Sequence, residues 1–395
     1  MIEVKDKEKC CGCTACASAC PVGCITMEAD EEGFLYPHVD PSACIGCSRC
    51  EKACPILNRI DEEPFYQQAF VLQAKDKELL QDSTSGAAFS LLARQMFSRG
   101  GSVYGVGYDE NGMPAHKCAN DEGTLAEMRG SKYVQSNLLG VFSEIKGRLD
   151  RGEPVLFSGL PCQIEGLLAF LGGVKPSGLV LVDLVCHSVG SPLVFDLYKQ
   201  TISQDGYVRF KDKRPYGYQY SQISFTDHDG DVQYRSGVES DVYMRSFFSN
   251  INVRPSCYEC AFKKRYRVSD ITIWDCYNAH SFCQDIDDNL GASSVLCHSV
   301  AGLEMVLKLE GEAILQSTDV DELLCREWAF TQSVKKPEDR DRFFRDCAEI
   351  DGPEALFNKW FPVTGKVIVE RTVRRALSRF GLLGKFKNFV KGLAR

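Results

Sequence analysis

The amino-terminal part of the sequence contains two copies of one cysteine spacing, C-x2-C-x2-C-x3-C-P. The copies comprise Cys10, Cys13, Cys16, Cys20 and Pro21, and Cys44, Cys47, Cys50, Cys54 and Pro55. Four thiolates must surround each cubane of iron and sulfide, and the short spacing lets one loop supply three of them. The pattern therefore predicts two [4Fe–4S] clusters.

In runs with this spacing, the fourth cysteine binds the cluster of the other run. We therefore assign one cluster to Cys10, Cys13, Cys16 and Cys54, and the other to Cys44, Cys47, Cys50 and Cys20. A zinc site needs only two C-x2-C pairs, so zinc would leave the third cysteine of each run unused. Residues 1–60 are predicted to form a two-cluster ferredoxin domain in which Cys11 and Cys24 have no role, and residues 61–64 a linker.

The composition is ordinary for a globular protein, with 44% hydrophobic and 25% charged residues in a chain of 395. The chain is long and shows no signal peptide, so its twenty cysteines indicate a reducing cytoplasm rather than disulfides. The sequence contains no run of about 18 apolar residues, so no membrane span is expected. Residues 366–395 carry a net charge of +8, which leaves −16 on the rest of the chain and argues against nucleic-acid binding.

From residue 68 the pattern alternates between short apolar strands and helices. We predict strands at 69–74, 102–108, 155–157, 179–185 and 270–275, helices at 83–99, 137–150, 162–171, 191–203, 301–310, 320–329 and 338–349, and antiparallel strands at 207–210, 222–226 and 232–234. The fold class is therefore an α/β domain with a parallel or mixed sheet, joined to the α+β ferredoxin domain. Ligands of such sheets bind at the carboxyl ends of the strands, where the loops 83–86, 159–163 and 186–191 lie.

The loop 83–86 and the segment 129–133 carry residues suited to an anionic ligand. Ser85 and Gly86 offer a hydroxyl and backbone N–H groups at the expected start of a helix, which is a natural seat for phosphate. Arg129, Lys132 and Tyr133 add two cations and an aromatic ring. The alternatives are an ordinary helix cap for the first loop and a surface loop for the second.

Read together, five segments resemble the beta-subunit family of the coenzyme F420-reducing hydrogenases and dehydrogenases. They are 129–136 (RGSKYVQS), 157–163 (FSGLPCQ), 183–188 (DLVCHS), 254–260 (RPSCYEC) and 269–273 (SDITI). The resemblance implies that residues 68–350 form a domain that binds FAD, whose flavin exchanges electrons with iron–sulfur clusters and hydride with an organic partner. In founding members that partner is coenzyme F420.

The resemblance also implies roles for single residues. Cysteines at four motif positions, Cys162, Cys186, Cys257 and Cys260, are the number that a third [4Fe–4S] cluster needs, although separated cysteines also serve as small buried apolar side chains. His187 is assigned to proton delivery near the flavin, with a structural histidine as the alternative. Cofactor binding is assigned to Ser85, Gly86, Arg129, Ser131, Lys132, Tyr133 and Gln163.

Three departures from the family pattern bear on the cofactor. Leu160 replaces the usual Thr, Ser188 and Gly190 change the motif after Cys186, and Trp274 and Cys276 stand in the segment where the family has Gly-Asp-Phe. The indole of Trp274 is expected over the flavin or substrate pocket. A changed substrate or weakened flavin binding follows as a hypothesis.

The carboxyl-terminal residues 366–395 predict a basic amphipathic helix. Val369, Val373, Ala376, Leu377, Phe380 and Leu383 recur at helical spacing with arginines between them, and a second piece continues with Phe386, Phe389, Val390 and Leu393. Such a helix binds an anionic membrane surface or docks on an acidic protein. Both alternatives stay open here.

These observations predict a cytoplasmic iron–sulfur flavoprotein oxidoreductase that also contacts the inner membrane surface if the tail binds lipid. Reduced ferredoxin or a similar donor supplies the electrons, and a small molecule is the substrate. The alternatives are an F420-linked subunit of a larger complex and a non-catalytic electron-transfer protein that contains clusters only.

Overall fold

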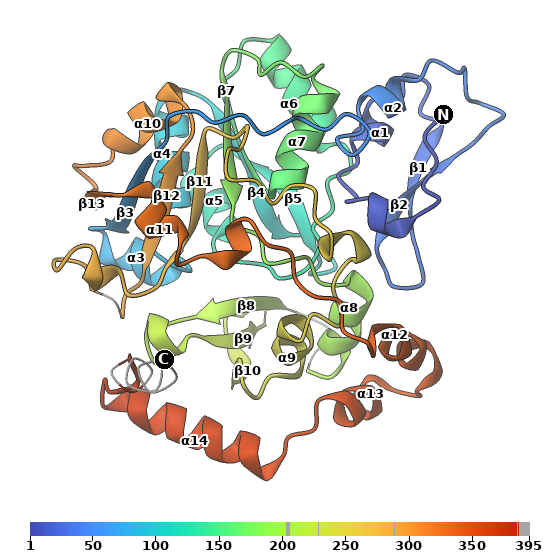
Figure 1. Cartoon of the computed structure of the whole chain (residues 1–395). Coiled ribbons are helices and arrows are strands. Elements are labelled where there is room, and N and C mark those ends of the chain that lie inside the picture. Colours follow the sequence, from blue (N-terminus) through green and yellow to red (C-terminus); the bar gives the residue numbers. More distant parts are fainter. Residues whose placement is uncertain (203–205, 228, 288, 385, 387–395) are drawn as a thin grey trace.

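The computed structural model describes residues 1–202, 206–227, 229–287, 289–384 and 386, and its centre is an eight-stranded mixed sheet (Figure 1). The strands are β3 (Gln68–Ala74), β4 (Ser102–Tyr108), β5 (Pro114–Ala119), β6 (Val155–Gly159), β7 (Leu179–Leu184), β11 (Ile271–Cys276), β12 (Ala292–Cys297) and β13 (Ala313–Thr318). Their order in the sheet is β13-β3-β12-β11-β7-β6-β4-β5. The pairs β4–β6, β6–β7 and β7–β11 are parallel and the others antiparallel, which confirms the predicted mixed α/β class.

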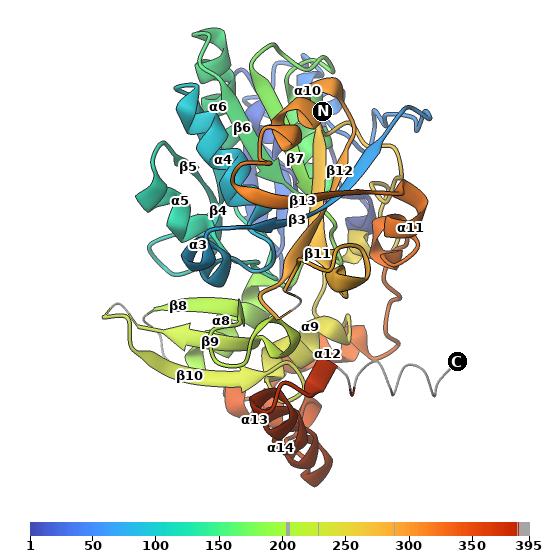
Figure 2. The same cartoon turned by 90° about the vertical axis from the view of Figure 1, so that its left-hand side faces the viewer.

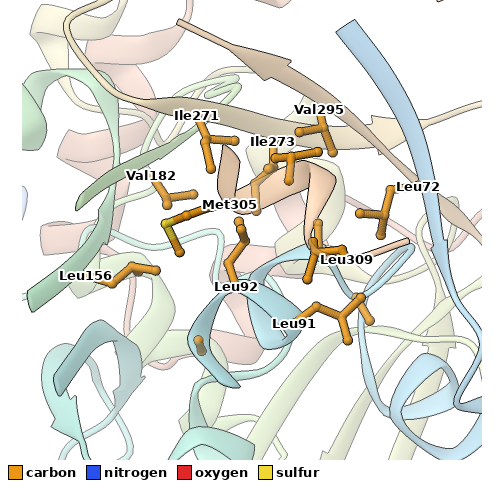
Figure 3. Packing of buried hydrophobic residues seen from close by; sticks show 14 of the residues in the cluster. Leu72, Leu91, Leu92, Leu156, Val182, Ile271, Ile273, Val295, Met305 and Leu309 are labelled. Atoms are coloured by element: carbon orange, nitrogen blue, oxygen red, sulfur yellow. The ribbon is translucent and has the colours of Figure 1, made fainter. Parts of the chain in front are cut away.

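Helices cover both faces of this sheet. On one face lie α3 (Lys77–Asp82), α4 (Ala88–Ser98), α5 (Glu122–Met128) and α10 (Val300–Leu307), and on the other lie α6 (Val141–Asp150) and α7 (Pro161–Phe170). Figure 3 shows Met305 of α10 beside Val182 of the sheet, with Leu92 of α4 below it and Leu91 of α4 next to Leu309. The central strands β6 and β7 are buried on both faces and are therefore mostly apolar.

The ferredoxin module is a small unit at one end of the large sheet. It consists of η1 (Lys7–Lys9), α1 (Ala15–Ser18), the antiparallel hairpin β1 (Ile25–Ala29) and β2 (Leu35–Val39), and α2 (Arg49–Lys52). The hairpin turn is fixed to the rest of the chain, because Glu32 accepts two hydrogen bonds from Arg340 at 2.6 and 2.5 Å. Gly33 has a φ of +82°, and a Cβ there would lie 2.6 Å from the Leu193 amide nitrogen, so the turn packs directly on its neighbour.

A smaller layer lies beneath the large sheet (Figures 1 and 2). It contains the antiparallel strands β8 (Tyr207–Asp212), β9 (Gln222–Thr226) and β10 (Val232–Gly237) and the helices α8 (Pro192–Gln200), α9 (Val242–Phe248), α12 (Arg340–Glu349) and α13 (Pro353–Trp360). Phe195, Phe210, Tyr243, Phe247 and Phe343 form the centre of their shared core. The remaining helical segments are η2 (Tyr218–Tyr220), η3 (Pro255–Cys257), η4 (Ala279–Ser281), α11 (Val320–Leu324), η5 (Trp328–Phe330) and α14 (Gly365–Arg379).

Several predicted elements differ from those in the structure. The helix expected from residue 83 begins at Ala88, because α3 precedes it and residues 83–86 form a turn before Ala87 adopts a left-handed conformation with φ of 69°. The helices expected at 137–150 and 320–329 are shorter, and β5, β12 and β13 were not predicted. These three strands contain small or polar residues, so packing against neighbouring strands defines them more than local pattern does.

Candidate electron-transfer site and cofactor cavity

The cysteines of the ferredoxin module line two separate cavities. Cys10, Cys13, Cys16 and Cys54 line one cavity of about 440 Å³. Cys20 lines the other cavity, together with Cys24, Cys44, Cys47 and Cys50. The chain therefore brings the fourth cysteine of each run to the other run, which is the arrangement expected for two cubanes. Among the described residues, no three metal-ligating side chains converge on a point suited to a single ion.

A third group of cysteines lines a cavity between the module and the large sheet. Cys162 stands in the first turn of α7, Cys186 follows β7, and Cys257 and Cys260 lie in and after η3. Burial raises the pKa of Cys186 to about 11, so its thiol stays protonated unless a metal displaces the proton. The structure thus gathers the four motif cysteines in one place, while their role as cluster ligands stays a prediction.

Cys11, which the sequence left without a role, lies between the first and third cysteine groups. It lines both cavities, and its thiol interacts with the thiols of Cys13 and Cys162. Gly166, one turn after Cys162 in α7, allows this close approach, because a Cβ at Gly166 would lie 2.9 Å from Cys13 Sγ. No local pattern distinguishes Cys11, because Cys162 reaches it only when the module docks on α7.

Arg254 is a completely buried cation at the same boundary. Its guanidinium donates hydrogen bonds to the Cys10 carbonyl at 2.8 Å, to Gln135 Oε1 at 2.7 Å and to the Leu35 carbonyl at 3.0 Å. Burial alone would lower the pKa of Arg254, but the thiolate forms of Cys10, Cys11 and Cys257 favour the charged guanidinium and raise it. A buried charge needs an opposite charge close by, and a cubane held by four thiolates would supply it. The side chains present therefore fit clusters in the first and third cavities.

Beside the third cysteine group lies a cavity of about 420 Å³, called the larger cavity below because the cavity lined by that group measures only about 40 Å³. The two cavities have part of their walls in common, namely Leu160, Gln163, Cys186 and Val189. The carboxyl ends of β6 and β7 and the segment around Trp274 in β11 also line the larger cavity. A cofactor in this cavity would therefore lie next to a cluster held by the third cysteine group.

Six of the seven residues predicted to bind the cofactor line this larger cavity. They are Ser85, Arg129, Ser131, Lys132, Tyr133 and Gln163. Gly86 is the exception, because it does not line this cavity. Its N–H already donates to Ser293 Oγ at 3.0 Å, and a Cβ there would lie 2.2 Å from the Leu72 carbonyl oxygen. This glycine is explained by the close approach of its backbone to β3 and β12.

The two predicted cations of the cavity differ in their surroundings. Arg129 forms an ion pair with Glu122 and donates to Ser90 Oγ at 3.3 Å, so its charge is already compensated. Lys132 Nζ donates to the carbonyl oxygens of Met128 at 3.0 Å and Arg129 at 3.1 Å, and burial lowers the pKa of Lys132 to about 7. Lys132 is therefore the cation more suited to receive an anionic group.

His187 also lines the larger cavity, where it lies against Phe247, Phe248 and Trp328. Its Nε2 is 2.8 Å from Asn250 Oδ1, and burial lowers the pKa of the imidazole. A neutral imidazole in this position can accept a proton. Next to it, the buried Ser188 Oγ has no hydrogen-bond partner among the described residues, as expected of a polar group that a ligand completes.

A buried ion pair between Lys211 of β8 and Asp275 of β11 also lines the cavity and was not predicted. Burial alone would lower the pKa of Lys211, but the Asp275 carboxylate and the nearby phenols of Tyr133 and Tyr277 outweigh this effect and raise it. Trp274 lines the cavity as expected, and its indole packs edge-on against Phe330 at 5.5 Å.

Two parts of the chain match models of known protein families, one of an iron–sulfur domain and one of an oxidoreductase subunit. Residues 152–322 match the model for the carboxyl terminus of the coenzyme F420 hydrogenase/dehydrogenase beta subunit, and residues 9–57 match a 4Fe-4S dicluster domain. These matches confirm the resemblance to the coenzyme F420 hydrogenase/dehydrogenase beta-subunit family over residues 152–322 and show a dicluster domain at the amino terminus.

One solved structure, from the F420-reducing [NiFe] hydrogenase complex of Methanosarcina barkeri in a xenon derivative, is similar to this chain with a TM-score of 0.47. The two sequences are 16% identical, and the match covers 68% of this chain and 90% of that one. No curated protein matches the sequence.

Proposed function

We propose that this chain is an iron–sulfur flavoprotein oxidoreductase that links a one-electron donor of the ferredoxin type to the reduction of an organic substrate. Bound in the larger cavity, FAD would supply the conversion between single electrons and hydride. The observation that supports this function most directly is the wall common to the third cysteine cavity and the larger cavity, formed by Leu160, Gln163, Cys186 and Val189. Residues 1–60, 68–350 and 366–395 are the proposed domains.

The chain's own residues would act on the bound group and on the substrate. Lys132 would bind the pyrophosphate, and Ser85 and Ser131 would add hydrogen bonds along the same wall. His187 would exchange a proton at the imidazole nitrogen that does not contact Asn250. Phe248 and Trp328 pack edge-on against this histidine and would orient its ring.

The proposal is tested by cofactor analysis of the full chain, purified and reconstituted without oxygen. Three cubanes and one flavin correspond to about twelve iron, about twelve sulfide and one FAD per chain. The double variant Cys257→Ser/Cys260→Ser should retain about eight iron with the flavin still bound. Clusters without flavin would contradict the proposal and support an electron-transfer protein, whereas zinc bound at the cysteines would contradict every version of it.

A second candidate is an F420-linked subunit of a larger complex, because the family description names coenzyme F420. The two candidates differ in the partner that receives hydride. Reduced, FAD-loaded protein mixed with oxidised F420 should bleach the deazaflavin absorbance if the second candidate is correct. If it does not, the substrate is another small molecule and the first candidate stands.

A further inference from the structure

The helix α14 presents its apolar side chains to solvent and its arginines to the protein. Ile368, Val369, Val373 and Phe380 are 44%, 63%, 44% and 77% exposed. In contrast, Arg371, Arg374 and Arg375 are half-buried on the opposite face of the helix. An amphipathic helix that covers a protein core is oriented the other way, with its apolar stripe inward. The exposed apolar face therefore fits a partner outside the chain.

The inward face of α14 holds the helix to the body of the protein. Both views show α14 as the outermost element below the small sheet, and it contacts η2. Arg375 lies near the phenol of Tyr220, and Arg371 near that of Tyr234. After the helix, the buried Leu383 and the contact of Gly384 with Gln219 fix the chain again. Contacts of the inward face and of the residues after the helix therefore fix the orientation of the exposed apolar face.

The charges around the exposed face identify its partner. Lys366 and Arg379 are exposed near the two ends of the helix, and the sequence beyond it adds Lys385, Lys387, Lys391 and Arg395. Glu370, the single acidic residue of 366–395, forms an internal pair with Arg374 at 2.6 Å. A second copy would place like charges together, whereas anionic headgroups complement this face.

We propose that α14 binds the surface of an anionic lipid bilayer, with Val369, Val373 and Phe380 in the boundary between headgroups and acyl chains. Among the described residues no helix is long and apolar enough to cross a bilayer, so the contact is interfacial. The acidic remainder of the chain, residues 1–365 with a net charge of −16, would be repelled from the same surface, so we expect the contact to be made through α14.

The test is flotation of the full, cluster-loaded chain with vesicles of phosphatidylcholine, alone or mixed with phosphatidylglycerol. We expect flotation with the anionic vesicles only, weakened by salt, and at least a tenfold lower bound fraction for Val369→Gln/Phe380→Gln. The control Val174→Gln changes a valine that is 75% exposed outside this face and should float like the unaltered chain. Cluster absorbance and circular dichroism would establish that the variants are folded.

Three results would overturn the proposal. These are no flotation of the full chain, flotation that the double variant retains, and equal flotation with neutral vesicles. If the full chain instead self-associates and the double variant does not, a second copy covers this face. Because flotation requires neither flavin nor substrate turnover, its outcome is independent of the proposed oxidoreductase function.

Discussion

Arg254 Nε donates a hydrogen bond to the Cys10 carbonyl oxygen at 2.8 Å, which places a buried positive charge between the first and third cysteine groups. A positive charge stabilises the reduced, more negative form of a nearby cluster. We therefore predict that Arg254→Gln lowers the midpoint potentials of both clusters by at least about 59 mV, a tenfold change in a one-electron equilibrium. Potentiometric titration followed by electron paramagnetic resonance measures this shift.

A matched variant separates charge from packing. Gln135 accepts a hydrogen bond from Arg254 at 2.7 Å and donates one to the Cys11 carbonyl at 3.2 Å, yet carries no charge. Gln135→Leu should therefore leave the potentials within a few millivolts of their original values. Arg254→Lys keeps the positive charge, so its potentials should stay close to those of the unaltered chain. If Gln135→Leu and Arg254→Gln lower the potentials equally, Arg254 acts through structure and not through its charge.

Gly166 sets how closely the ferredoxin module approaches α7. A Cβ at this position would lie 2.9 Å from both Cβ and Sγ of Cys13, so Gly166→Ala must displace the cysteine or the module. We expect slower electron transfer from the module to the proposed third cluster, measured by rapid-mixing spectroscopy with a chemical reductant. Overpacking of this kind also costs about 1–3 kcal/mol of stability.

The control for this variant is Gly147→Ala in α6. Its nearest contact is the Arg151 side chain at 3.6 Å, so a methyl group fits. Alanine in a helix is more favourable than glycine by about 0.5–1 kcal/mol, and this variant should be slightly stabilised with unchanged electron transfer. Unchanged transfer in Gly166→Ala as well would mean that electrons do not pass through the contact between Cys13 and α7.

The sequence predicted those features that depend on nearby residues. The cysteine spacing places each run in one loop, and the apolar strands 102–108 and 155–157 were found because burial on both faces leaves a continuous apolar run. Long-range features were not predicted. Cys11 meets Cys162 only through docking, and Gly86 packs on β12, more than 200 residues later in the chain. Lys211 lies in a different layer from Asp275, so their ion pair could not be predicted, although Asp275 at the end of a predicted strand indicated a residue near the ligand end of the sheet.

The tail illustrates the same limit. Helical spacing predicted the amphipathic helix in 366–395, and α14 contains residues 365–379. The direction of its apolar face could not be predicted, since it depends on contacts with η2 and Leu383. The second predicted piece, from Phe386 to Leu393, lies mostly outside the described residues.

Lys132 should make flavin binding depend on pH. Burial lowers its pKa to about 7 from its ordinary 10.5, and an anionic pyrophosphate prefers the cationic form. Affinity for FAD should therefore be highest below about pH 7 and fall at higher pH, by at most about tenfold per pH unit. Without ligand, burial of this ammonium destabilises the folded chain fully below about pH 7, and the penalty falls as pH rises from 7 to 10.5 because only the unfolded chain keeps the proton there.

Quenching of flavin fluorescence by the protein measures this dependence. Lys132→Met should bind FAD more weakly and with little change between about pH 6 and pH 9. Lys117→Met, which alters a partly exposed lysine 3.5 Å from Glu127, should retain the full dependence. A pH profile that Lys132→Met leaves intact would assign the proton to another group.

The ion pair between Lys211 and Asp275 connects β8 of the small sheet to β11 of the large sheet, so breaking it should lower the stability of the fold. The side chains are only 12% and 18% exposed, so Asp275→Asn leaves a buried ammonium without its counter-charge. We expect a loss of about 3–5 kcal/mol, because breaking a buried pair costs far more than the pair contributes. The double variant Lys211→Met/Asp275→Leu, which replaces both charges, should recover most of this loss.

Thermal unfolding of the full chain tests this prediction against an exposed pair. Lys146 and Asp150 are 2.6 Å apart in α6 but 49% and 62% exposed, so Asp150→Asn should cost only about 0.3–0.5 kcal/mol. Equal losses for Asp150→Asn and Asp275→Asn, or a double variant less stable than Asp275→Asn alone, would show that the charge of Lys211 is compensated by water in the cavity. In that case Lys211 would be available to an anionic substrate, because its ammonium would already be solvated beside Tyr133 and Tyr277.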